Sequence, residues 1–127
     1  MRRILVAGCP RVGKTTLADH LAAALGVAAR HTDDLIASHD WSGASEEAAR
    51  WISEPGPWIV EGVAAVRALR KWLVANPAGL PCDALFWSET PRVALTKGQF
   101  AMGKGCVTVW EEIRDRVYAR GVAVRRF

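Results

Sequence analysis

Gly8-Cys9-Pro10-Arg11-Val12-Gly13-Lys14-Thr15, the stretch at residues 8–15, decides the fold of this chain. It matches the pattern G-x-x-x-x-G-K-[ST], in which glycines let the backbone curl until several N–H groups point at one anion. In such a loop the lysine, here Lys14, reaches the outer phosphates of a nucleotide, and the hydroxyl of Thr15 is a ligand for Mg²⁺. The sequence therefore predicts a phosphate-binding loop over residues 8–16, which includes Thr16.

The flanks of this loop have the arrangement that phosphate binding requires. Residues 3–7 form a short apolar run that is typical of a buried parallel strand. After the loop, Leu17, Leu21 and Leu25 have helical spacing, and Gly26 suits the left-handed position at which a helix ends. A helix that begins directly after the loop adds its partial positive charge to the anion site.

Segments with strand and helix patterns alternate along the rest of the chain, which is typical of an α/β fold with a parallel sheet. Further strands are expected at residues 27–31, 58–60, 83–87 and 122–124. Further helices are expected at residues 34–39, 45–53, 63–75 and 109–119, with another opening at Thr90 and Pro91. Residues 40–44 are expected to be a loop. We therefore expect one domain over residues 1–127, with three layers in which helices flank a central parallel sheet of about five strands.

Acidic residues follow two of the predicted strands. Asp33 and Asp34 come after the second strand, and Glu61 ends the third. In open parallel sheets, ligands bind beyond the carboxyl ends of the strands. We therefore expect these carboxylates and the phosphate-binding loop to meet at one edge of the sheet.

Composition limits the classes of protein to which this chain can belong. No run of about 18 apolar residues exists, so no membrane span is expected. The three cysteines, Cys9, Cys82 and Cys106, lack the spacing of metal ligands, and so low a number is typical of the reducing cytoplasm. Cys9 lies in the loop, where N–H groups would lower its pKa; an inert loop side chain is the alternative.

The net charge of +4 hides an uneven distribution of charged residues. Residues 31–61 contain seven acids and one base, whereas the rest of the chain contains 16 bases and six acids. A polyanion such as DNA would favour the basic part. The arginines near the C-terminus are more typical of a solvated face, so we do not expect a nucleic acid partner. The sequence leaves the oligomeric state open.

The sequence resembles the small P-loop kinases of the broad adenylate kinase-like group. The matching pieces are residues 8–16, then Thr32-Asp33-Asp34-Leu35-Ile36, then Trp58-Ile59-Val60-Glu61-Gly62. The resemblance covers roughly residues 1–90, and it implies a P-loop NTPase-type fold, ATP as the phosphate donor and Mg²⁺ as cofactor. It also implies an aspartate near the acceptor after the second strand. The Thr-Asp-Asp-Leu-Ile string is similar to members that phosphorylate hydroxyl groups.

The resemblance implies a role for each residue at this edge. Lys14 would neutralise charge on the β- and γ-phosphates, and Thr15 would bind Mg²⁺ with Glu61 as the nearby carboxylate. Asp33 or Asp34 would orient the acceptor hydroxyl and take its proton. Asp33 is preferred, because Asp34 begins the predicted helix. The alternative for each carboxylate is a structural role, in capping a helix or closing a strand end.

Kinases of this group carry an arginine-rich lid after the fourth strand, and here residues 92–108 occupy its place. The candidate lid cations are Arg92, Lys97 and Lys104, and three glycines between residues 97 and 106 would give the segment its mobility. The alternative is a solvated loop with scattered charge. The base-binding loop and closing helix of the group are expected to be missing or abbreviated, because Phe127 follows directly after the predicted fifth strand.

The predicted function is an ATP-dependent phosphotransferase that moves the γ-phosphate to a small hydroxyl-bearing or nucleotide acceptor with Mg²⁺. A nucleotide acceptor requires a pair of arginines for its phosphate, and the sequence offers only Arg50 and Arg67 there. One alternative is a nucleotide-binding ATPase or switch that transfers phosphate to water, although the Asn-Lys-x-Asp base reader of regulatory GTPases is absent from the sequence. The other is a nucleotide-binding module without catalysis.

Overall fold

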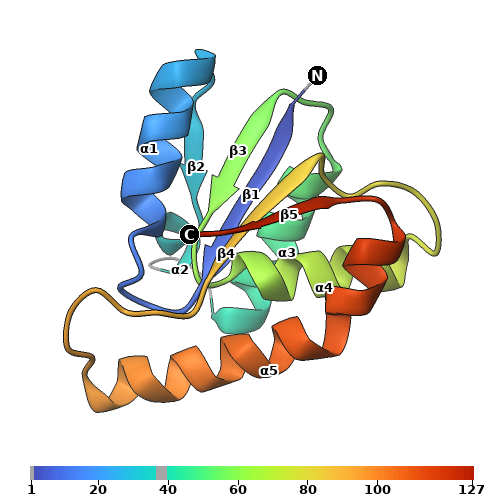
Figure 1. The fold of residues 1–127 in the computed structure, drawn as a ribbon. Helices are drawn as coiled ribbons and strands as arrows, with labels where there is room; N and C mark the ends of the chain where they lie inside the picture. The colour runs from blue at the N-terminus through green and yellow to red at the C-terminus, as the bar shows by residue number, and fades with distance from the viewer. Residues whose placement is uncertain (1, 37–39) are drawn as a thin grey trace.

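The computed structural model describes residues 2–36 and 40–127, and within them five parallel strands form one sheet between helices (Figure 1). The strands are β1 (Arg3–Gly8), β2 (Ala29–His31), β3 (Trp58–Glu61), β4 (Ala84–Ser88) and β5 (Ala123–Arg126). The helices are α1 (Lys14–Leu25), α2 (Asp33–Ile36), α3 (Trp41–Ser53), α4 (Ala65–Ala75) and α5 (Lys97–Ala119). The order β2-β3-β1-β4-β5 puts β1 at the centre, and the predicted α/β fold with a parallel sheet is confirmed.

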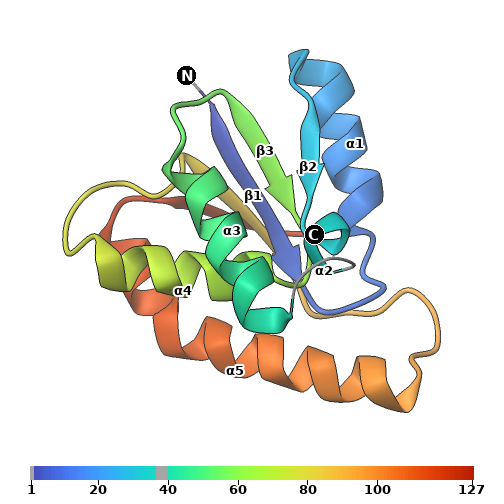
Figure 2. The same cartoon turned by 180° about the vertical axis from the view of Figure 1, so that it is seen from behind.

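The alternation of side chains along β1 divides the core into two layers. Ile4 and Val6 face α1, where they pack with Ala18. Leu5 and Ala7 belong to a larger cluster on the other face, which includes side chains of α3, α4 and α5. Figures 1 and 2 show α1 on one side of the sheet and these three helices on the other. The phosphate-binding loop therefore extends from the most enclosed strand of the molecule.

The parallel register brings the carboxyl ends of the strands to one edge of the sheet. Glu61, at the end of β3, is in register with Val6 of β1 and with His31 of β2. On the other side of β1, Gly8 is in register with Ser88 at the end of β4. The loop after β1, the helix after β2 and the carboxylate of β3 therefore meet at this edge.

Helix α5 runs without interruption through residues 97–106, where the sequence predicted a stretch broken by glycines, so that prediction is wrong. Helix α5 begins with a capping box, in which the Gln99 N–H donates to Thr96 Oγ1 at 3.1 Å and the Thr96 N–H donates to Gln99 Oε1 at 3.0 Å. A Cβ at Gly103 would lie 3.5 Å from Pro10 of the phosphate-binding loop. Helix α5 therefore lies in van der Waals contact with the loop at this glycine.

Helix α3 begins at Trp41, within the segment that was predicted to be a loop and before the expected start at Ser45. The Asp40 carboxylate accepts a hydrogen bond from the Gly43 N–H at 2.6 Å. It satisfies a backbone donor that the first turn of a helix leaves free, and so stabilises the earlier start.

Two further helix predictions changed in the structure. No helix opens at Thr90 and Pro91, because residues 89–96 of the described chain are not helical. The helix predicted for residues 34–39 runs from Asp33 to Ile36, and residues 37–39 lie outside the described part. None of the helices in the described residues is both long and apolar enough to cross a lipid bilayer.

The close approach of β1 to β4 predicts that Gly8→Ala destabilises the fold. Gly8 has a φ of +149°, and a Cβ there would lie 2.2 Å from the Ser88 carbonyl oxygen. That oxygen also accepts the Cys9 N–H, so it is not free to move away. We expect the free energy of unfolding, measured by urea denaturation, to fall by about 2–4 kcal/mol.

Gly26→Ala is the matched control for this substitution. Gly26 also has a positive φ, +66°, but a Cβ there would meet nothing within 4 Å. We expect a loss of about 1 kcal/mol, which reflects the backbone conformation alone. Equal losses in the two variants would contradict the crowding that we infer at Gly8.

Candidate active site

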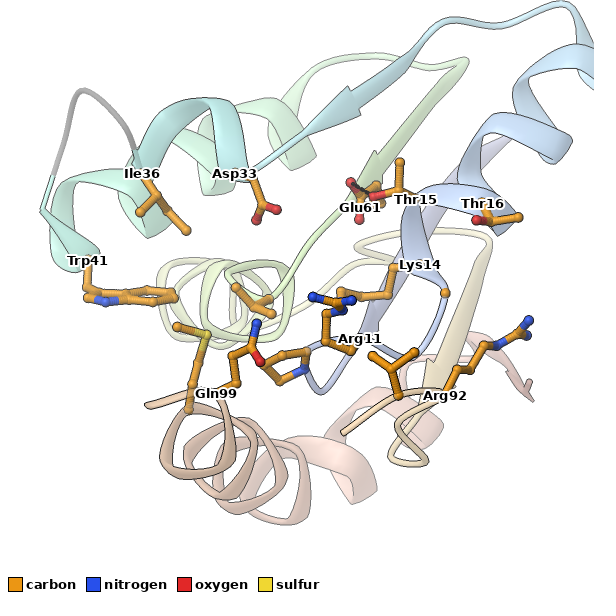
Figure 3. Close-up of a pocket in the computed structure, with 15 residues that line it drawn as sticks. Arg11, Lys14, Thr15, Thr16, Asp33, Ile36, Trp41, Glu61, Arg92 and Gln99 are labelled. Carbon is orange, nitrogen blue, oxygen red and sulfur yellow. Dashed lines mark hydrogen bonds between the residues drawn. The ribbon is translucent and has the colours of Figure 1, made fainter. Parts of the chain in front are cut away.

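A cleft of about 560 Å³ opens at the carboxyl edge of the sheet (Figure 3). The residues that line it are Pro10, Arg11, Gly13, Lys14, Thr15, Thr16, Asp33, Ile36, Trp41, Glu61, Val63, Arg92, Val93, Gln99 and Met102. Gly8, Cys9 and Val12 are the members of the loop that do not line it, and all three are buried. The structure thus brings the surface of the phosphate-binding loop together with two of the predicted carboxylates, Asp33 and Glu61, in one cavity.

Lys14 is held ready for an anion within the loop. Its side chain is 8% exposed, and its Nζ donates to the Cys9 carbonyl oxygen at 2.6 Å. Burial lowers the pKa of Lys14, and the negative charges of Glu61 and Asp33 act in the opposite direction. Because its hydrogen-bond partner is a neutral carbonyl, a phosphate oxygen can replace it with a stronger, charge-assisted bond.

Glu61 is the buried carboxylate of the cleft, with 2% of its surface exposed. Its Oε1 accepts a hydrogen bond from the Thr15 hydroxyl at 3.1 Å and lies 2.6 Å from His31 Nδ1. A hydroxyl beside a carboxylate suits Mg²⁺, which prefers oxygen ligands and keeps several waters. Among the described residues, no group of three or more His, Cys, Asp or Glu side chains could hold a metal. Phosphate oxygens and water would have to complete such a site.

His31 joins the site through Glu61, although the sequence did not single it out as a site residue. The hydrogen bond to Glu61 raises the pKa of His31, and Asp19, 3.7 Å from its Nε2, adds to the effect. A protonated His31 compensates the buried negative charge of Glu61. Only the pairing of β2 with β3 brings these two side chains together, so no local sequence signal could have revealed the contact.

The two adjacent aspartates have different positions. Asp33 lines the cleft, and Asp34 does not. Both belong to the short helix α2, in which successive side chains point about 100° apart. Asp33 is therefore the carboxylate that can face a ligand in the cleft.

The predicted lid cations are not gathered at the cleft. Arg92 lines it, and its Nε donates to the Val12 carbonyl oxygen at 3.1 Å, which supports the loop from outside. Lys97 and Lys104 are exposed on α5 and do not line the cleft. The ammonium group of Lys104 lies 4.9 Å from the centre of the Phe100 ring. The geometry of α5 thus gives no support to a phosphate-binding role for these two lysines.

One end of the cleft, to the left in Figure 3, has a wall that the sequence analysis missed. It consists of Ile36, Trp41, Gln99 and Met102. Trp41 is 37% exposed, and its ring stacks on the Arg67 guanidinium, whose Cζ lies 5.3 Å from the ring centroid. An aromatic ring, two apolar side chains and one amide suit a small organic molecule. The capping-box pattern at residues 96–99 was the available signal that a helix starts here.

Neither arginine that the sequence offered for an acceptor phosphate lines the cleft. Arg50 pairs with Glu47 on the surface of α3. Arg67 belongs to α4, where its guanidinium donates to Cys106 Sγ at 3.6 Å. It lines a neighbouring cavity of about 370 Å³, of which Trp41 is also part. The arginines that do line the cleft lie at the phosphate-binding loop, so the pair expected for an acceptor phosphate does not face it.

Cys9 does not have the lowered pKa that its place in the loop suggested. All three cysteines are free and buried. Burial raises the pKa of Cys9 to about 11, which outweighs the opposite effect of Lys14. At neutral pH the group is a thiol, and a thiol is a poor nucleophile.

The comparisons with known proteins agree with this architecture. No protein-family model and no curated protein sequence matches the chain. Its structure is similar to that of a shikimate kinase from Acinetobacter baumannii, solved in complex with shikimate: the TM-score is 0.58 at 16% identity, covering 100% of this chain and 83% of that one. A crystal structure of a shikimate kinase from Bacteroides thetaiotaomicron gives a TM-score of 0.52 at 15% identity, with coverages of 97% and 84%. These are small P-loop kinases, so the chain has a P-loop kinase fold, as predicted.

The contact between His31 and Glu61 predicts that the stability of the metal-free protein depends on pH. Because the pKa of His31 is raised in the folded state, the folded protein binds this proton more tightly than the unfolded chain does. The stabilisation is complete below the ordinary histidine value of about 6.5 and is lost as the pH rises through the raised pKa. We expect the Tm difference between wild type and His31→Gln, measured in EDTA, to shrink over this range.

His20→Gln serves as the control, because His20 is exposed on α1. Its Tm difference from wild type should stay constant over the same pH range. A constant difference for His31→Gln as well would mean that the contact with Glu61 does not involve a proton.

Proposed function

We propose that this protein is a kinase that transfers the γ-phosphoryl group of ATP to a hydroxyl group of a small molecule. The observation that carries the proposal is the common cleft of Lys14, Thr15, Asp33 and Glu61. Phosphoryl transfer requires bound phosphates, neutralised charge and a positioned nucleophile, and little covalent chemistry from the protein. Lys14 would bind the phosphates and neutralise their charge, and Thr15 and Glu61 would hold Mg²⁺. Asp33 would position the nucleophile.

The donor side of the cleft is the phosphate-binding loop. Its backbone N–H groups and the N-terminus of α1 receive the triphosphate. Lys14 exchanges its hydrogen bond with the Cys9 carbonyl for one with a phosphate oxygen. Thr15 and Glu61 would hold Mg²⁺, which when bound supplies positive charge to the β- and γ-phosphate oxygens.

The acceptor side lies between α2 and the start of α5. Asp33 faces this space, and Ile36, Trp41 and Met102 form its apolar wall. Gln99 offers both a donor and an acceptor of hydrogen bonds. Because this wall lacks a pair of arginines, it favours an uncharged or weakly charged hydroxyl compound over a nucleoside monophosphate.

The chemical step follows from this placement. Asp33 accepts a hydrogen bond from the acceptor hydroxyl and orients its oxygen toward the γ-phosphorus. The acceptor oxygen forms a bond to that phosphorus while the bond to the β–γ bridging oxygen breaks, and the electron pair of that bond leaves with ADP. The acceptor proton passes to Asp33. Lys14 stabilises the charge that collects on the phosphate oxygens.

A screen for ADP production tests the proposed function. Purified protein is incubated with ATP, Mg²⁺ and a library of polyols, hydroxy acids, sugars and nucleosides. We expect one class of compound to raise ADP production above the background rate, and Lys14→Ala to abolish that increase because the phosphates lose their main cation. ADP production that no acceptor changes would instead indicate an ATPase or switch, and an absence of ATP binding would contradict the proposal altogether.

Asp33→Asn and Asp34→Asn form a matched pair that tests the acceptor side. We expect Asp33→Asn to lower kcat by about 10²- to 10⁴-fold, because an amide cannot take the acceptor proton. Asp34→Asn should change kcat less than about twofold, since Asp34 does not line the cleft. Steady-state kinetics with the acceptor from the screen measure both values. A larger loss in Asp34→Asn would transfer the role to the other aspartate.

A further inference from the structure

Arg11 has a backbone conformation that arginine rarely adopts. Its φ is +63°, and it is the non-glycine residue with positive φ in the described residues. Left-handed conformations are unfavourable for a residue with a long side chain, and they persist where the surrounding structure enforces them, often at functional sites. Here the Arg92 N–H donates to the Arg11 carbonyl oxygen at 2.8 Å and helps to hold this conformation.

The side chain of Arg11 is directed into the cleft and has no partner there. It lines the cleft and is exposed. In Figure 3 it extends from the loop toward the wall that carries Asp33 and Glu61. Within residues 2–36 and 40–127, no carboxylate forms an ion pair with its guanidinium and no aromatic ring stacks on it. Within the described residues, the fold therefore gains no ion pair, hydrogen bond or ring contact from the side chain of an arginine at this strained position.

Phosphoryl transfer in this cleft would require a second cation in addition to Lys14. Phosphoryl transfer places negative charge on the oxygens of the γ-phosphoryl group, and Lys14 alone offers one point charge. The Arg92 guanidinium is engaged with the Val12 carbonyl, and in Figure 3 it points away from Asp33. The lysines of α5 lie outside the cleft. Arg11 is the remaining cation among the residues that line it.

We propose that the Arg11 guanidinium binds the γ-phosphoryl group of ATP and stabilises its charge during transfer. As the acceptor oxygen bonds to phosphorus and the bond to the bridging oxygen of ADP breaks, Arg11 donates hydrogen bonds to the γ-phosphate oxygens and keeps its own protons. The planar guanidinium suits this role, because its N–H groups can engage two phosphate oxygens at once. The inference rests on the proposed function and adds a catalytic residue to it.

Arg11→Gly separates a role toward the γ-phosphate from a role in the fold. Glycine adopts positive φ without strain, so the loop should keep its shape and the Tm should not fall. We expect the affinity for a non-hydrolysable ATP analogue with Mg²⁺, measured by calorimetry, to fall about 10- to 100-fold, with little change for ADP. We expect kcat to fall by about 10²- to 10³-fold.

Two further variants complete the experiment. Arg11→Lys keeps the positive charge but loses the fork of donors, so it should retain part of the preference for the ATP analogue over ADP. Arg114→Ala removes an exposed arginine of α5 that does not line the cleft, and it should leave both affinities and kcat unchanged.

The possible results are distinguishable. Equal losses of affinity for ADP and for the ATP analogue in Arg11→Gly would assign Arg11 to the structure of the loop and overturn the inference. Unchanged affinities and kcat would overturn it as well. In both cases the wild-type protein would still bind and use ATP, so the proposed function would stand. A wild-type protein that binds no ATP would refute the proposed function and this inference together.

Discussion

Crowding of the backbone around the phosphate-binding loop is the constraint on which the rest of this structure depends. On one side, Gly8 lies so close to the Ser88 carbonyl oxygen that a Cβ would not fit between them. The same oxygen accepts a hydrogen bond from the Cys9 N–H at 3.1 Å. On another, a Cβ at Gly13 would lie 2.9 Å from the Arg92 side chain. Helix α5 covers the loop at Gly103, where a Cβ would be in ordinary van der Waals contact with Cys9 and Pro10. A loop that is held in this way loses little additional freedom when it binds an anion, so the fold has already met much of the entropic cost of binding.

Glu61 connects this loop to the other half of the site. One buried carboxylate contacts Thr15 at the start of α1 and His31 at the end of β2, and it belongs to β3 itself. A buried charge is tolerated when charged and hydrogen-bonding partners surround it, and these two side chains supply both kinds. The same carboxylate that would serve Mg²⁺ therefore also links three elements in the metal-free protein, through its Oε1. For this reason, substitutions at Glu61 would alter stability together with the proposed chemistry, and its neighbours are the better probes of the site.

Unfavourable features are concentrated at the cleft, while the core of the protein is ordinary. Arg11 adopts a positive φ, and Lys14 is buried without a carboxylate in hydrogen-bond contact. Elsewhere, apolar side chains on both faces of β1 form well-enclosed clusters. Proteins retain strain and buried charge where these features serve a ligand, because the surrounding structure can compensate for them. This contrast supports the cleft as the candidate site, independently of any resemblance to known kinases.

The sequence by itself determined the glycine loop between β1 and α1, the alternation of strands and helices, and the edge of the sheet at which the cleft opens. These features follow from local rules: the glycines at residues 8 and 13, the apolar run before them and the helical spacing after them. Only the tertiary structure decided that Asp33 rather than Asp34 lines the cleft, that His31 contacts Glu61, and that residues 97–119 form one continuous helix whose lysines do not line the cleft. Each of these depends on how distant segments pack. The glycines of α5 are an example, because a glycine inside a continuous helix and one in a break look the same in a sequence. Only the tertiary structure shows that Gly103 packs against the loop and that Gly105 lies beside Arg67.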